Sequence, residues 1–102
     1  MISKKLLSAV LGEKISVVKK PYRDIKQYVY YDCVDKTEKS INTHELAHKC
    51  KEWALGGGHI FNVQMSDDIT LVYIGSIGKD IGAPSEPEAI FKACEWIMEH
   101  KQ

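Results

Sequence analysis

The sequence predicts a small α+β domain in which helices pack on a mainly antiparallel four-stranded sheet, in the order α-β-β-α-β-β-α. Three observations lead to this class. Apolar residues make up 44% of the 102 positions and charged residues 27%, as in ordinary folded domains. Three segments show the apolar period of amphipathic helices, and four short segments are rich in β-branched and aromatic residues. A chain of this length builds one hydrophobic core, so residues 1–102 are predicted to form a single domain.

The first helix and the first hairpin are predicted near the N-terminus. Ser3 is a suitable N-cap, and Gly12 is a suitable C-terminal stop. Between them one apolar stripe is formed by Leu6, Leu7, Val10 and Leu11. Residues 14–20 and 25–34 follow as two antiparallel strands joined by a turn at residues 21–24.

Alternation along the second strand separates its tyrosines into two groups. Tyr28 and Tyr30 share one face of the sheet, while Val29 and Tyr31 share the other. If the first pair is exposed on an uncovered face, it forms a contact patch for a protein partner, which could be a second copy of the chain.

A central helix is predicted after a polar connection at residues 35–39. Asn42 is a good N-cap, Glu45 lies three residues later as in a capping box, and the glycines at residues 56–58 end the helix. At 100° per residue, its inward stripe consists of Leu46, Cys50, Trp53 and Ala54.

The second half repeats this order of elements. Residues 59–65 and 69–77 are predicted as a hairpin with one half-polar face, and residues 79–84 as a loop. Ser85 and Glu88 then form a capping box for the last helix, whose broad apolar arc predicts the most buried helix of the domain. The strings K-C-K-E-W and K-A-C-E-W in the two helices are similar, which both duplication and shared helix composition explain.

His44, Glu45 and His48 spell H-E-x-x-H, and the string HELAH resembles the motif of zinc metallopeptidases. Histidines four residues apart on a helix can share a zinc ion, with the glutamate placed to deprotonate its bound water. The resemblance implies a zinc hydrolase with His44 and His48 as ligands and Glu45 as general base. A third ligand would come from the downstream carboxylates Asp67, Asp68, Glu86, Glu88, Glu95 and Glu99.

The same helix also has a structural interpretation, which we favour. Glu45 has a capping position, and His44 lies in the first turn, where the helix dipole disfavours a cation. Both imidazoles fall on the side opposite the inward stripe and therefore face solvent. We expect no catalytic residue and no bound metal, and zinc hydrolysis is the alternative.

The charge balance argues against a nucleic-acid partner. Lys plus Arg equals Asp plus Glu at 14 each, so no overall field attracts nucleic acid or an anionic membrane. Residues 74–81 (IGSIGKDI) are similar to the glycine loop of KH nucleic-acid-binding modules, but a strand precedes them where that module has a helix. A nucleic-acid-binding module is the second alternative.

Cysteine usage and hydropathy predict a cytoplasmic protein. Cys33, Cys50 and Cys94 are odd in number and form no C-x-x-C pair, which is typical of reduced thiols. The N-terminal apolar run is too short for a signal peptide, and no segment approaches the roughly 20 apolar residues of a membrane span.

Residues 43–98 resemble the closing half of small phage-encoded α/β proteins of the ABA sandwich type. The resemblance is carried mainly by residues 87–93, PEAIFKA, although Phe91 and Lys92 stand where cysteine and arginine are more usual. It implies a helix-covered sheet and a phage or prophage accessory protein, and it assigns no catalytic residue. The sequence thus favours a non-catalytic cytoplasmic domain that acts through protein–protein contacts, with either an unidentified protein or a second copy as partner.

Overall fold

In the computed structural model, residues 3–12, 14–19 and 27–100 are described, and within them the chain forms three helices and six strands. The elements are α1 (Lys4–Leu11), β1 (Ile15–Lys19), β2 (Gln27–Asp32), β3 (Thr37–Asn42), α2 (Thr43–Gly56), β4 (Phe61–Met65), β5 (Thr70–Ile74), β6 (Lys79–Ala83) and α3 (Glu86–Glu99). They confirm the α+β class. The predicted single four-stranded sheet is wrong, because the strands form two antiparallel three-stranded sheets, β1-β2-β3 and β4-β5-β6.

The two strands that the sequence analysis missed are β3 and β6, which were expected as a polar connection and a loop. Each is the third strand of its sheet and pairs along its whole length with the preceding strand, β2 or β5. Their inward positions are few: Ile41 and Ala83 are buried, while most of their other side chains are exposed or half-buried. Backbone pairing with a neighbour outweighs weak strand propensity here. The predicted turn at residues 21–24 lies outside the described residues.

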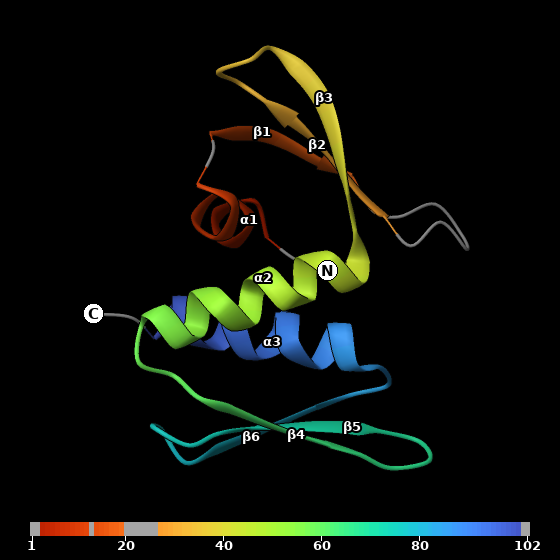
Figure 1. Ribbon diagram of the computed structural model, residues 1–102, viewed down its shortest axis with the longest axis vertical. Helices are drawn as coiled ribbons and strands as arrows, with labels where there is room; N and C mark the ends of the chain where they lie inside the picture. The colour runs from red at the N-terminus through yellow and green to blue at the C-terminus, as the bar shows by residue number, and fades with distance from the viewer. Residues whose placement is uncertain (1–2, 13, 20–26, 101–102) are drawn as a thin grey trace.

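The helices form a layer between the two sheets (Figure 1). In this sandwich α3 packs on β5 and β6 as well as on α2, and α1 packs on β1. The core is continuous across the layers: the ring of Tyr28 on β2 meets that of Phe91 on α3 edge to face, with centroids 5.6 Å apart. The prediction that α3 is the most buried helix is confirmed by its buried side chains Pro87, Ala89, Ile90, Phe91, Ala93, Cys94 and Ile97.

All three predicted helix starts are confirmed by their N-caps. The side chains of Ser3, Asn42 and Ser85 accept hydrogen bonds from backbone N–H groups in the first turn of α1, α2 and α3. The return bond expected from Glu45 to its cap is not formed among the described residues. Glu95, expected on the solvent face, is half-buried and accepts hydrogen bonds from the backbone N–H and Oγ of Ser3 at 3.0 and 2.7 Å.

The two halves of the chain repeat one unit, which is β-β-β-α and not the predicted β-β-α. Buried positions of β2 and β3 recur 42 residues later in β5 and β6, and those of α2 recur 43 residues later in α3. The corresponding buried pairs are Tyr28 and Thr70, Tyr30 and Val72, Asp32 and Ile74, Ile41 and Ala83, Leu46 and Ala89, Ala47 and Ile90, Cys50 and Ala93, and Ala54 and Ile97. Matching burial across both units shows that the K-C-K-E-W echo reflects equivalent places in the fold.

Candidate functional site

The H-E-x-x-H residues lie on the solvent side of α2, as the apolar period predicted. Leu46, Cys50 and Ala54 are buried on the opposite side of this helix. The side chains of His44 and Glu45 are exposed, and His48 Nε2 lies 2.8 Å from Glu52 Oε1, one turn along the helix. The second imidazole therefore has a partner within its own helix.

Both histidines line a hollow of about 170 Å³ between α2 and the start of α3. Among the residues that line it are His44, His48 and Glu86, the last from the start of α3. Within the described part of the chain, no three histidine, cysteine, aspartate or glutamate side chains gather closely enough to hold a metal ion. Of the downstream carboxylates considered as a third ligand, Glu86 is the one that lines this hollow.

The glycine loop at residues 75–78 is a four-residue turn between antiparallel strands. The N–H groups of Ile77 and Gly78 both donate to Ile74 O, and Gly78 has a left-handed φ of 73°. A KH module instead places its loop between two helices. Here β6 begins directly at Lys79, so no second helix follows the turn.

Tyr28 and Tyr30 do not form a contact patch, because neither side chain is exposed. Both side chains lie on the inner face of the first sheet and are buried, while Tyr31 is on its outer face. The alternation was predicted correctly, but the exposure on which the patch depended is not found, because the helix layer covers the face that carries this pair.

The outer face of the second sheet carries a row of exposed apolar side chains: Ile69, Leu71 and Tyr73. A Cβ atom added at Gly82 would lie 2.9 Å from Ile69 Cδ1 and 3.1 Å from Leu71 Cδ2, so both side chains lie over this glycine. The row is therefore continuous across β5 and β6. Beside it is a hollow of about 460 Å³, lined in part by Asn62, Gln64 and Asp80.

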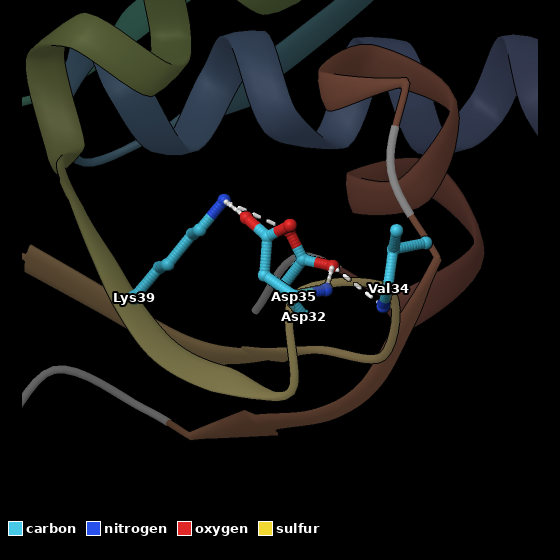
Figure 2. Close-up of polar contacts among 4 residues, drawn as sticks. All are labelled: Asp32, Val34, Asp35 and Lys39. Carbon is cyan, nitrogen blue, oxygen red and sulfur yellow. Dashed lines mark hydrogen bonds and ion pairs between the residues drawn. The ribbon is translucent and has the colours of Figure 1, made fainter.

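Asp32 organises the turn between β2 and β3 (Figure 2). Only 3% of it is exposed, and its carboxylate accepts hydrogen bonds from the backbone N–H groups of Val34 and Asp35 and from Lys39 Nζ at 2.8 Å. The hydrogen bond from Lys39 lowers the pKa of Asp32 to about 2, aided by the backbone donors and opposed by burial. Lys39 Nζ also lies 2.8 Å from Asp35 Oδ2, and bonding to both carboxylates raises its pKa. We interpret this cluster as structural, since these bonds all join residues of the β2–β3 turn and its flanking strands.

The buried thiols have the inert character predicted for them. Cys94 Sγ donates to Cys50 O at 3.5 Å, and both residues are buried between α2 and α3. The neighbouring Cys94 side chain, together with burial, raises the pKa of the Cys50 thiol. A thiol that stays protonated is a poor nucleophile.

A recess of about 670 Å³ lies where α2 and α3 end side by side. Its lining includes Trp53 of α2 and the C-cap Gly57, Trp96 and His100 at the end of α3, His59, and Ile77 from the β5–β6 turn. His59 Nδ1 lies 2.7 Å from Ser76 Oγ, and His100 Nδ1 donates to Trp96 O at 2.8 Å. The His100 ring stacks on that of Trp96, with centroids 4.0 Å apart. We call this recess the aromatic cavity.

Comparison with protein-family models, curated proteins and solved structures gives no match to this chain. No helix in the described ranges is both long and apolar enough to cross a membrane.

The aromatic cavity was not predicted from the sequence, although one signal pointed to it. K-C-K-E-W and K-A-C-E-W place Trp53 and Trp96 near the ends of the two helices, and a histidine follows each within six residues. Trp53 was assigned to the inward stripe, but it is only half-buried at the edge of the core. A tryptophan at equivalent ends of two neighbouring helices indicates a shared aromatic surface.

Proposed function

We propose that the chain is a non-catalytic cytoplasmic domain that acts through protein–protein contacts, and that its contact surface is the outer face of the β4–β6 sheet. The observation that carries the proposal is the continuous apolar row of Ile69, Leu71 and Tyr73 on an otherwise polar face. Contiguous exposed apolar side chains on a small domain are typical of interaction sites. An accessory protein of phage type, as the sequence resemblance implies, would act in this way.

The occupant we propose for this face is a second copy of the chain. The formal net charge is zero, so two copies approach without long-range repulsion. Two identical faces related by a twofold axis bring the row of one copy against the row of the other, and packed sheets leave about 10 Å between them for interdigitating side chains. The hollow beside Tyr73 offers space for an aromatic side chain of the partner copy.

Sedimentation velocity over a concentration series tests this proposal, with Tyr73→Lys as the disrupting variant. Tyr31 is the equivalent residue of the first sheet and supplies the matched control. The two tyrosines are 41% and 37% exposed, and each pairs across the sheet with an acidic residue, Asp80 or Glu38.

We expect the unmodified chain and Tyr31→Lys to dimerise with increasing concentration, and Tyr73→Lys to sediment as a monomer. A chain that stays monomeric at hundreds of micromolar would overturn the self-association. Equal loss of dimer in both variants would place the interface elsewhere.

A further inference from the structure

The aromatic cavity is assembled from the same position of both repeated units. Trp53 and Trp96 are 43 residues apart, at equivalent places in α2 and α3, and they are the only two tryptophans in the chain. The two helices run in the same direction, so their C-terminal ends meet on one side of the molecule (Figure 1). The volume of the aromatic cavity, about 670 Å³, falls within the range of about 300–1,000 Å³ that is usual for small-molecule sites.

The cavity offers hydrogen-bond donors that the protein itself does not use. Neither indole N–H of Trp53 and Trp96 has an acceptor among the described residues. His59 and His100 each use Nδ1 in a bond to the protein, and neither Nε2 has a partner in the described ranges. His59 Nε2 is a donor when Nδ1 accepts from Ser76, whereas His100 Nδ1 donates, so Nε2 of its neutral ring is an acceptor. Because the two indoles are only half-buried, their N–H groups are open to solvent, and a bound ligand can supply the acceptor in its place.

The charges around the cavity favour a negatively charged ligand. No acidic side chain lines it among the described residues. Lys79 Nζ lies 5.9 Å from the ring centroid of Trp96, which brings a cation to the same ring that lines the cavity. The C-terminal ends of α2 and α3 oppose a negative charge. In α2 the last carbonyl groups accept bonds from the N–H groups of Gly57, Gly58 and His59, which offsets part of this effect.

We propose that the aromatic cavity binds a planar aromatic carboxylate, with its ring against the tryptophan side chains and its carboxylate towards the indole N–H groups and Lys79. Aromatic walls select a flat ring, since offset stacking and edge contacts with indole and imidazole stabilise it. The donor-rich and acid-free surroundings select a carboxylate over an ammonium group. This site is separate from the sheet face proposed for self-association.

Nitrogen–proton correlation NMR tests the proposal directly, because two tryptophans give two indole N–H signals. The probes are 2-naphthoate, 2-naphthalenemethanol and 2-naphthylmethylamine, which share one ring and carry a negative, neutral or positive group. We expect 2-naphthoate to shift both indole signals saturably and to bind at least about tenfold more tightly than the amine, a ratio equivalent to 1.4 kcal/mol.

Two variants check the role assigned to charge. Lys79→Gln should weaken 2-naphthoate severalfold while leaving the neutral alcohol unchanged. Lys36→Gln removes the same charge from the turn of the first sheet, where Lys36 lines no part of the cavity, and should change neither. The proposal is overturned if millimolar 2-naphthoate leaves both indole signals in place, if the amine binds as tightly, or if Lys36→Gln weakens binding as much as Lys79→Gln.

Discussion

The rotation of α2 about its axis decides whether its histidines face solvent, and two leucines in this helix report it. Leu46 lies on the buried side and is fully enclosed, whereas Leu55, near its C-terminal end, is 60% exposed. Replacing each by alanine makes the same chemical change in the same helix. The difference between the two variants therefore measures burial and little else.

The structure sets the size of this difference. Leu46→Ala removes buried carbon atoms worth about 2.4 kcal/mol of transfer free energy at about 0.8 kcal/mol for each CH₂ group. The cavity left behind adds to this, so the free energy of unfolding should fall by about 3–5 kcal/mol. In Leu55 about two fifths of the side chain is shielded, so the corresponding loss is at most about 1 kcal/mol, partly offset by the better helix propensity of alanine.

Urea unfolding followed by circular dichroism measures both variants against the unmodified chain. We expect a gap of about 2 kcal/mol or more between them, or a melting temperature lower by at least about 8 °C for Leu46→Ala than for Leu55→Ala. Equal losses, or a larger loss for Leu55→Ala, would mean that the helix is rotated differently. The His44 and His48 imidazoles would then face the protein interior, and the reasoning against a metal site would fail.

Three further predictions concern acid stability, backbone strain and metal content. Folding lowers the pKa of Asp32 from 3.8 to about 2, so its stabilising contribution is complete above pH 4 and is lost as the pH falls towards 2. In urea unfolding, the Asp32→Asn variant should have a lower free energy of unfolding at pH 7, because the bond with Lys39 is weakened. Its free energy of unfolding should also vary less between pH 4 and 2, because asparagine does not titrate. Gly78→Ala should lower the free energy of unfolding by about 1–2 kcal/mol because φ is 73°, whereas Gly75→Ala, without a positive φ, should cost less by the same assay. Elemental analysis of protein purified without chelator should find substoichiometric zinc that His48→Ala leaves unchanged; stoichiometric zinc lost in that variant would establish the hydrolase.

The helices could be predicted because their signals are local. Capping residues such as Ser3 and Ser85 and the apolar period of α2 act within one or two turns, and the structure confirms the starts and the buried side that they predicted. The strands β3 and β6 could not be predicted in this way. Thr37 to Asn42 has one buried side chain, Ile41, and this segment is extended because β2 lies beside it.

The candidate sites were predicted less well, because each depends on which face is covered. Alternation correctly separated Tyr28 and Tyr30 from Tyr31, but it carries no information on which side the helix layer packs. The aromatic cavity brings together the ends of α2 and α3, which are distant in the sequence. Their proximity follows from parallel packing of the two helices, a tertiary property that periodicity does not contain.

The repeat offers a physical reading of H-E-x-x-H that needs no metal. Shifted by 43 residues, His44, Glu45 and His48 correspond to Pro87, Glu88 and Phe91 in α3. Only the glutamate is common to both units, and in each it lies in the first turn, where a carboxylate is stabilised by the positive end of the helix dipole. The other two positions are buried in α3, where Phe91 packs against Tyr28 of the first sheet, and exposed in α2, where histidine is tolerated.

The tryptophan is also common to both helices, as are the lysine and the second glutamate of the two similar strings, and dipole stabilisation does not account for it. Trp53 and Trp96 lie at the opposite ends from the glutamates, are only half-buried, and line one cavity together. An aliphatic side chain without a polar atom can fill a core position equally well, and Leu46 and Ile90 do so elsewhere in these helices. If the indoles serve packing alone, Trp53→Leu and Trp96→Leu should lower the free energy of unfolding and leave the binding of 2-naphthoate nearly unchanged. If they form a ligand site, binding should be lost while the fold is retained.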